Sequence, residues 1–272
     1  MTDDGKYTAD QPKVPGADVI YRPAGNAGEY APLATNPYLG CGHKCAYCYV
    51  PAAIHMPRPD FDAGAVDKPR WIERLTADCR RYAAAGETGH QVMLSFSTDP
   101  YHPGDTGLTR QTLTTLADHG FGFCTLTKGG RRALRDVDLF RPKRDAFAAT
   151  LTTLDERFSQ RWERGAPLPA DRISALRFFY ESRIFTWVSL EPTLDVEASR
   201  AIVRKTHGFV DLYKIGKANY LKEITRTTDW RDYTLRMIDL CQQLGVKHYV
   251  KKDLQTHLPP GYHNPLRVQQ HH

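Results

Sequence analysis

Stretches with the hydrophobic pattern of strands alternate with stretches that have the pattern of helices along most of the chain. Helical spacing marks 71–86, 107–120, 131–140, 155–164, 171–182, 195–207 and 229–245, and strand-like runs occupy 91–100, 121–129, 145–154, 184–192, 210–219 and 247–253. Because a strand–helix–strand unit favours a right-handed crossover, this order predicts a parallel sheet. The six or seven units in 272 residues predict an α/β fold, a partial or full barrel.

The composition changes along the chain and predicts three segments. Residues 1–30 are rich in Gly, Pro, Asp and Ala without sustained periodicity, which indicates an extended N-terminal arm. Residues 31–255 hold the alternating pattern, and we expect a short first strand within 31–40. Residues 256–272 are expected to form a C-terminal tail.

The sequence contains no apolar run near the roughly 18 residues of a membrane span. The N-terminus MTDDGKYTADQPKVPGAD is polar and lacks the hydrophobic region of a signal peptide. We therefore expect a cytoplasmic, reducing location and no membrane partner. The formal charge of +6 permits a nucleic-acid or phosphate-bearing partner without requiring one.

Three cysteines fall close together in CGHKCAYC, at Cys41, Cys45 and Cys48. Such a compact run can wrap one small inorganic centre, because its short loops close at little entropic cost. Structural zinc usually takes four ligands in two separated pairs. A four-iron cluster held by three cysteines leaves one iron without a protein ligand, and an open coordination site is what chemistry requires. The run therefore indicates a catalytic rather than a structural centre.

The other cysteines are Cys79, Cys124 and Cys241. Cys79 and Cys241 lie among apolar residues at helical spacing, which indicates buried core thiols. Cys124 lies in a predicted strand, where it is interpreted either as a small core residue or as a group that faces the site.

Polar residues gather at the carboxyl ends of the predicted strands, where parallel barrels carry their chemistry. Alternation places Ser95, Ser97 and Asp99 on one face of their strand, and Val92, Leu94, Phe96 and Thr98 on the other. Other shared faces are formed by Cys124, Leu126 and Lys128, by Trp187, Ser189 and Glu191, and by Leu212, Lys214 and Gly216, while the last strand ends in Lys251, Lys252 and Asp253. A single polar strand end is compatible with simple solvation, but their recurrence predicts a lined cavity.

The CxxxCxxC spacing, with Tyr47 just before the last cysteine, resembles the cluster loop of the radical S-adenosylmethionine (radical SAM) enzymes. The resemblance implies a partial (β/α)6 TIM-like barrel, a [4Fe-4S] cluster on Cys41, Cys45 and Cys48, and bound S-adenosylmethionine. It implies reductive cleavage of that cofactor to a 5′-deoxyadenosyl radical. It also implies an external one-electron donor of the flavodoxin or ferredoxin kind.

Within this superfamily, residues 36–250 are most similar to the spore photoproduct lyase branch, although the similarity is weak outside the motifs. Tyr47 and Tyr49 flank the last cluster cysteine as paired tyrosines do in that lyase. The resemblance assigns cofactor-binding roles to Tyr47, Ser97, Thr98, Asp99, Lys128, Thr152 and Arg172. Asp99 would lie near the methionyl amine, Lys128 near its carboxylate, and Thr152 near the ribose.

Two departures from the lyase bear on the chemistry. The alignment puts Phe96 where the lyase has its hydrogen-donating cysteine, and Glu191 where the lyase is apolar. Cys124 is a candidate replacement donor, with a core role as the alternative. Glu191 is predicted either to bind a substrate amine, a ribose or a metal-bound water, or to pair structurally with Lys214 or Lys251. The candidate catalytic residues are thus Tyr47, Tyr49, Cys124 and Glu191.

Three functions remain open from the sequence. The first is a radical SAM enzyme that acts on a nucleic acid or nucleotide, and the second is the same enzyme class acting on a peptide or small metabolite. The third is a zinc-stabilised nucleic-acid-binding module, which lacks a fourth ligand near the cysteines unless His43 or His55 serves. Basic residues at 128–144 are compatible with a solvated helix face or with phosphate binding at the cavity mouth.

Overall fold

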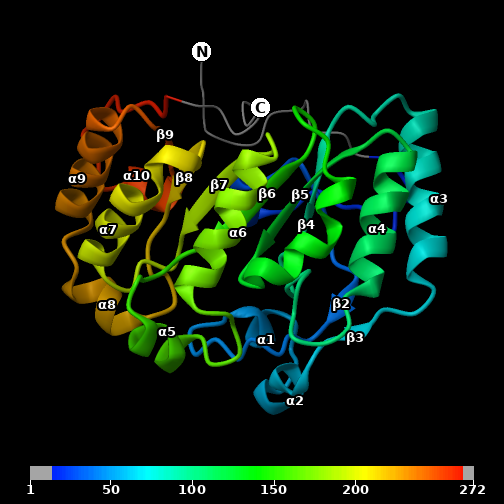
Figure 1. The fold of residues 1–272 in the computed structure, drawn as a ribbon, viewed down its shortest axis with the longest axis horizontal. Coiled ribbons are helices and arrows are strands. Elements are labelled where there is room, and N and C mark those ends of the chain that lie inside the picture. Colours follow the sequence, from blue (N-terminus) through cyan, green and yellow to red (C-terminus); the bar gives the residue numbers. More distant parts are fainter. Residues whose placement is uncertain (1–13, 266–272) are drawn as a thin grey trace.

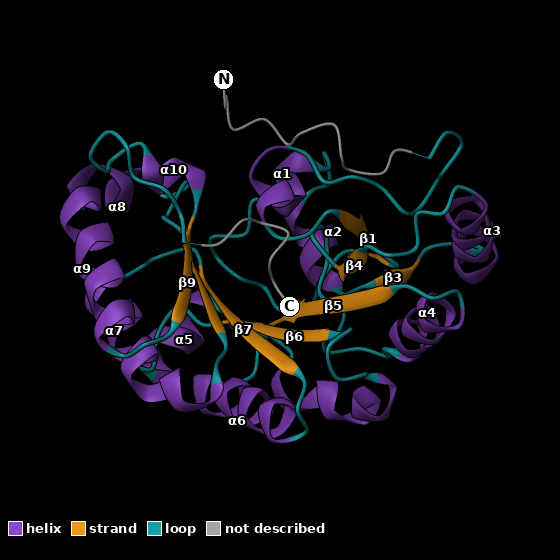
Figure 2. Ribbon diagram, turned by 90° about the horizontal axis from the view of Figure 1, so that it is seen from above, coloured by secondary structure: helices purple, strands orange, loops and turns teal. Residues whose placement is uncertain are grey.

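The computed structural model describes residues 14–265, and its centre is one sheet of seven parallel strands (Figure 1). Across the sheet, in chain order, these are β1 (Leu33–Thr35), β4 (Gln91–Leu94), β5 (Gly122–Thr127), β6 (Ala146–Thr150), β7 (Phe185–Leu190), β8 (Leu212–Ile215) and β9 (Lys247–Val250). The sheet curves into a partial barrel whose edge strands are β1 and β9 (Figure 2). The predicted α/β partial barrel is confirmed.

The long helices cover the convex face of this sheet (Figure 2). They are α3 (Trp71–Ala84), α4 (Gly107–Asp118), the 3-10 helix η2 (Gly130–Leu139), α6 (Pro169–Glu181), α7 (Val196–Thr206) and α9 (Trp230–Gln243). Each links two neighbouring parallel strands, as crossover connections require. Two of them, α7 and α9, begin at a capping carboxylate: Asp195 accepts hydrogen bonds from the backbone N–H groups of Glu197 and Ala198, and Asp229 accepts one from that of Asp232.

Both faces of the strands are buried, which explains their nearly continuous hydrophobic runs. On β5, Phe123 joins the large core between sheet and helices, whereas Cys124 joins a smaller cluster inside the barrel. The inner cluster also contains Met93, Trp187 and Tyr249. It fills the bottom of the barrel, so that any cavity has to lie above it, at the carboxyl ends of the strands.

Most of the shorter elements surround that end of the barrel. They are the 3-10 helix η1 (Gly25–Glu29), the hairpin strands β2 (Tyr38–Leu39) and β3 (Val66–Asp67), and helices α1 (Val50–Ala53), α2 (Arg58–Ala63), α5 (Glu156–Trp162), α8 (Lys222–Thr227) and α10 (Lys252–Gln255). The 3-10 helix η3 (His207–Phe209) instead precedes β8, at the amino ends of the strands. The cysteine run lies between β2 and α1. Among the described residues, no helix is both long enough and apolar enough to cross a bilayer.

The segment before β1 packs closely against the barrel from residue 17 onward. The Asp78 carboxylate on α3 accepts hydrogen bonds from the backbone N–H groups of Asp18, Val19 and Ile20 at 2.6–3.0 Å. At the other end of the chain, the Asn264 side chain bonds both N–H and C=O of Val250 at 2.8 Å. The expected segments 1–30 and 256–272 lie partly outside the described residues.

The predicted alternation along 91–100 is wrong beyond Leu94, where β4 ends. The backbone N–H groups of Phe96 and Ser97 donate to the Asn36 side chain, at 2.7 and 3.0 Å, instead of continuing a strand ladder. Phe96 therefore packs against the inner cluster rather than sharing the outer face of Val92 and Leu94.

Candidate active site

A cavity of about 560 Å³ opens at the carboxyl ends of the strands. Its lining divides into two ends. We call the part around Cys41, Cys45, Cys48, Asp99 and Lys128 the cysteine end. The far end comprises Tyr30, Ser189, Glu191, Lys217, Asn219, Tyr220 and Lys251. A space of this size suits a small-molecule cofactor together with part of a substrate.

The three predicted ligands Cys41, Cys45 and Cys48 all line the cysteine end. Their loop is held by backbone contacts, because Cys41 N–H donates to the Phe61 carbonyl at 2.8 Å and Cys48 N–H to the Cys45 carbonyl at 3.1 Å. Gly40 has φ +85°, and a Cβ there would lie 2.3 Å from the Gly64 carbonyl oxygen. This close approach therefore requires glycine.

The surroundings of the three thiols suit a cluster that shares their charge. Burial raises the pKa of Cys45 to about 12 and raises those of Cys41 and Cys48 as well. Buried thiols of this kind become thiolates when a bound metal compensates the charge. All three are free of disulfides. Their placement around one cavity fits a [4Fe-4S] cluster that leaves one iron without a protein ligand.

A single metal ion does not fit this donor set. Tetrahedral zinc holds its sulfurs about 2.3 Å from one point, so that they lie within about 4 Å of one another. Within residues 14–265, no group of three or more His, Cys, Asp or Glu side chains converges closely enough to hold one ion. The cysteine sulfurs bound to different irons of a cluster are farther apart than the ligands of one ion, so the arrangement of these thiols fits a cluster better than a single zinc ion.

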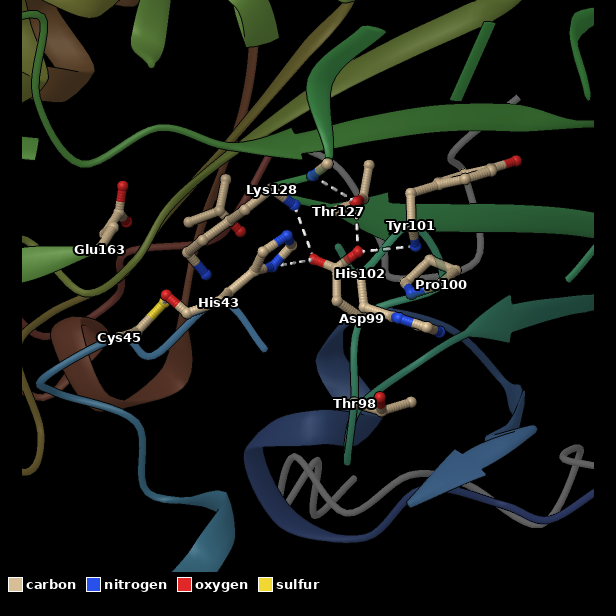
Figure 3. Close-up of polar contacts among 12 residues, drawn as sticks. His43, Cys45, Thr98, Asp99, Pro100, Tyr101, His102, Thr127, Lys128 and Glu163 are labelled. Atoms are coloured by element: carbon tan, nitrogen blue, oxygen red, sulfur yellow. Dashed lines mark hydrogen bonds and ion pairs between the residues drawn. The ribbon is translucent and has the colours of Figure 1, made fainter. Parts of the chain in front are cut away.

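His43, between the first two cysteines, points away from them toward Asp99 (Figure 3). Its Nδ1 lies 3.2 Å from Asp99 Oδ2, and its Nε2 lies 3.3 Å from Arg132 Nη1. Both ring nitrogens are therefore engaged away from the thiols, as expected for a loop-shaping residue. The zinc alternative thereby loses His43 as a fourth ligand.

Asp99 ties the cysteine loop to the ends of β4 and β5 (Figure 3). Its carboxylate accepts hydrogen bonds from the Tyr101 and Lys128 N–H groups, both at 2.8 Å, and from the Thr127 hydroxyl. Burial alone would raise the pKa of Asp99, but His43 and these donors hold it below its ordinary value. Thr98 donates to the Gly40 carbonyl at 2.6 Å, and Ser97 does not line the cavity.

Tyr47 and Lys128 both lie near Glu163, a buried carboxylate that the sequence analysis did not identify. The Tyr47 hydroxyl donates to Glu163 Oε1, and Lys128 Nζ lies 5.5 Å from the centre of the Tyr47 ring. Thr152 also donates to Glu163, at 3.2 Å, and Arg172 pairs with it at 2.5 Å. Thr152 and Arg172 therefore lie behind Glu163 and do not line the cavity, whereas Thr150 does.

The far end is organised around Glu191, which forms an ion pair with Lys251 rather than with Lys214. The Tyr30 hydroxyl donates to Glu191 at 2.7 Å and lies 3.1 Å from the Ser189 hydroxyl. The loop glycine Gly216 leaves room for Glu191, since a Cβ there would lie 2.9 Å from its carboxyl group. Tyr30 lies in a stretch without periodicity, so no sequence signal marked it as a site residue.

Lys214 lies below this group, between the rings of Tyr30 and Trp187. Its ammonium donates to the Tyr30 carbonyl at 2.9 Å and to the Glu29 carbonyl at 3.2 Å. Burial lowers the pKa of Lys214 to about 7.

Cys124 is buried in the inner cluster and does not line the cavity. Its sulfur lies 3.3 Å from Nε1 of Trp187, and burial raises the pKa of its thiol to about 12. Most of the basic residues that follow β5 are engaged within the chain: Arg131 pairs with Asp171, Arg135 with Asp136, and Arg141 with Asp145. This favours a structural role for that basic run.

Comparison with known proteins agrees with this geometry. The family model described as "Radical SAM superfamily" matches residues 35–197, which span the cysteine loop and the strands up to β7. The chain therefore belongs to the radical SAM superfamily, whose members, like the structural neighbours described below, are enzymes.

The relatives found by sequence include an uncharacterized protein of Mycobacterium tuberculosis, 29% identical over 169 residues, which cover 58% of this chain and 48% of that protein. An uncharacterized protein of Acidianus two-tailed virus is 26% identical over 211 residues, 74% of this chain and 69% of that protein. The chain thus spans about half the length of the mycobacterial relatives that it matches.

Solved structures share the fold at low sequence identity. A spore photoproduct lyase variant with bound AdoMet (S-adenosylmethionine) and dinucleoside spore photoproduct has a TM-score of 0.64 and 11% identity, over 81% of this chain and 76% of the lyase. Streptococcus suis SuiB bound to the precursor peptide SuiA has a TM-score of 0.63 and 14% identity, over 82% of this chain and 49% of SuiB. At this identity the likeness establishes the fold alone.

Proposed function

We propose that this chain is a radical SAM enzyme that holds a [4Fe-4S] cluster on Cys41, Cys45 and Cys48 and binds S-adenosylmethionine beside it. The observation that carries the proposal is that three unpaired thiols line one cavity while the nearby His43 is engaged elsewhere. The cluster and S-adenosylmethionine, when bound, supply a 5′-deoxyadenosyl radical that removes a hydrogen atom from a substrate.

The residues of the cysteine end suit distinct tasks in that reaction. Lys128 is cationic, since Cys45 and Glu163 raise its pKa despite the opposing effect of burial, and it is suited to offset the methionyl carboxylate. The Asp99 carboxylate already accepts three hydrogen bonds and pairs with His43. We therefore assign Asp99 to positioning Lys128 and His43. Tyr47, Thr152 and Arg172 act through Glu163 and keep the loop around Cys45 in place.

We assign the substrate to the far end and propose a nucleic acid or nucleotide. Two exposed tyrosines, Tyr49 and Tyr220, stack at the cavity with ring centroids 5.1 Å apart. Exposed aromatic rings offer a stacking surface to a base, and Lys217, which forms no ion pair among the described residues, offers a cation beside it. Glu191 and Tyr30 are suited to hydrogen-bond a polar group of the substrate.

The cofactor proposal is tested by anaerobic reconstitution with iron and sulfide, followed by dithionite and S-adenosylmethionine. We expect an oxygen-sensitive brown protein that forms 5′-deoxyadenosine, and no product from Cys41→Ala. Iron incorporation without cleavage, next to a working radical SAM enzyme as control, would refute the activity. One zinc and no iron in anaerobically prepared protein would revive the zinc module.

The substrate class is tested by binding of a single-stranded oligonucleotide to wild type, Tyr220→Phe and Tyr220→Ala. Stacking of one base is worth about 1–3 kcal/mol, so Tyr220→Ala should weaken binding about 5- to 150-fold while Tyr220→Phe keeps it. Binding that depends neither on the Tyr220 ring nor on the salt concentration would favour a peptide or small metabolite instead.

We also propose a cytoplasmic location and a flavodoxin- or ferredoxin-like electron donor. A reducing compartment keeps the cysteine thiols free of disulfides, and the donor supplies the electron for the reductive cleavage.

A further inference from the structure

The outer side of the cysteine loop is covered by the segment that follows α5. Cys45 and Glu163 form an antiparallel bridge, and Ala46 N–H donates to the Trp162 carbonyl at 2.7 Å. Gly165 N–H donates to the His43 carbonyl at 2.8 Å, and a Cβ on Gly165 would lie 2.1 Å from the Gly42 carbonyl oxygen. The two segments are thus in direct main-chain contact.

Side chains alternate across this bridge. Cys45 and Glu163 are buried, whereas the adjacent residues of the bridge, Lys44 and Arg164, are exposed. Lys44 directly precedes Cys45, and Arg164 directly follows Glu163, so two exposed cations lie next to the bridge that holds a cluster ligand.

Two more arginines extend this surface along α5. Arg157 and Arg161 are four residues apart, share one side of the helix and are exposed. We define the α5 basic face as Lys44, Arg157, Arg161 and Arg164. Within residues 14–265 none of them forms an ion pair or a side-chain hydrogen bond, which contrasts with the paired arginines after β5. The acidic residues of α5, Asp155 and Glu156, lie at its first turn.

The α5 basic face lies apart from the cavity mouth. Tyr49 directly precedes α1, and Tyr220 lies two positions before the first residue of α8. Both tyrosines line the cavity, whereas none of the four residues of the α5 basic face does. The charge of this face is therefore available to a second partner.

We infer that the α5 basic face docks an acidic one-electron carrier protein. The inference rests on the proposed function, in which the carrier loses one electron and the cluster gains it, with no bond broken and no proton moved. Because electron transfer weakens steeply with distance, a carrier should dock close to a cluster ligand, and Lys44 directly precedes Cys45. Clustered cations steer an acidic protein to such a surface and fix its orientation.

The test compares two triple variants with the same change in net charge. Arg157→Glu/Arg161→Glu/Arg164→Glu reverses the α5 basic face. The control, Arg80→Glu/Arg204→Glu/Arg231→Glu, reverses exposed arginines on α3, α7 and α9 that form no ion pairs among the described residues. Binding of an acidic flavodoxin at low salt is measured directly by biolayer interferometry, with circular dichroism as a check of folding. We expect the face variant to bind about tenfold or more weakly and to lose salt dependence, and the control to keep most of its affinity.

Activity measurements separate docking from catalysis. Formation of 5′-deoxyadenosine should fall in the face variant with reduced flavodoxin as donor, and should equal wild type with dithionite, a small reductant that needs no docking surface. Equal flavodoxin binding by both triple variants would overturn the inference. So would loss of oligonucleotide binding alone in the face variant, because it would make this face a nucleic-acid contact. If wild type does not cleave S-adenosylmethionine with dithionite, the proposed function fails, and the interferometry still decides whether the face docks the carrier.

Discussion

The two ends of the cavity are built in different ways. At the cysteine end, Cys41, His43, Cys45 and Cys48 come from one short run, and its shape is fixed by backbone hydrogen bonds and by Asp99. At the far end, Tyr30, Glu191 and Lys251 come from segments up to 221 residues apart and meet only through side chains. The cysteine end can therefore be recognised in the sequence as a motif, whereas the far end is formed only when the barrel folds.

The two ends also differ in how they bury charge. The Glu163–Arg172 pair behind the cysteine end is fully buried, with both side chains 0% exposed. At the far end, the Glu191 side chain is 18% exposed, so it keeps some contact with solvent. The cysteine end should therefore tolerate the loss of a partner less well than the far end.

The largest effect is expected from the cluster ligands themselves. Cys45→Ser should lower the iron content of reconstituted protein from about four atoms per chain to near zero and abolish formation of 5′-deoxyadenosine. The control is Cys241→Ala, which removes a buried core thiol on α9. This variant should keep both the iron content and the formation of 5′-deoxyadenosine. Full iron content in Cys45→Ser would mean that the cluster has a different ligand.

The charge comparison is tested by removing one cation at each end. Arg172→Met should lower the free energy of unfolding by about 3–5 kcal/mol, because it leaves Glu163 buried without its partner. Lys251→Met should cost less, since Glu191 retains access to water. Urea denaturation measures the free energy of unfolding of both variants. A larger decrease for Lys251→Met than for Arg172→Met would contradict the comparison.

Two buried lysines lie at or just below the far end, Lys251 directly after β9 and Lys214 on the neighbouring strand β8, and of the two only Lys251 has a carboxylate partner. Burial lowers the pKa of Lys214 to about 7, so from that pH upward the unfolded chain binds more protons than the folded one. The contribution of Lys214 to stability should therefore rise with pH, by about 2 kcal/mol between about pH 7 and pH 9. Urea unfolding of wild type and Lys214→Met across this pH range measures this contribution. If the free energies of unfolding of the two proteins change with pH in parallel, the prediction is wrong.

The smallest effect is expected at Cys124, which lies beneath the cavity. Cys124→Ala should leave the products unchanged, because the thiol does not reach the cavity, and should cost about 1–2 kcal/mol of stability through the lost sulfur atom. Product analysis by mass spectrometry and urea unfolding measure the two effects. A changed product would restore Cys124 as a hydrogen donor.

The order of the elements was predictable from sequence because hydrophobic periodicity is local. Helix α3 (Trp71–Ala84) and strand β7 (Phe185–Leu190) lie within the ranges expected for them. The alternation failed after Leu94 because a side chain distant in sequence, Asn36, takes the place of a neighbouring strand as hydrogen-bond partner. A period-two pattern carries no information about such a contact.

The site was predictable where a residue's direction follows from its strand. Ser189 on β7 lines the cavity, and so do Lys128 and Glu191, each one residue past its strand, as continued alternation along β5 and β7 implies. Residues farther beyond the strand ends were not predictable in this way. Thr152 and Arg172 lie behind Glu163, which no motif marked, and Tyr30 reaches the cavity from a segment without periodicity. Their roles as cofactor contacts or as positioning residues stay predictions.

The contacts of Glu29 have a consequence for biosynthesis. Its carboxylate accepts hydrogen bonds from the Tyr249 hydroxyl at 3.0 Å and from the Lys252 N–H at 2.8 Å, across more than 200 residues. These contacts cannot form on the ribosome until β9 and the residues that follow it have been made, more than 200 residues after Glu29. The wall of the cavity around Tyr30 is therefore completed only after the whole sheet has been synthesised.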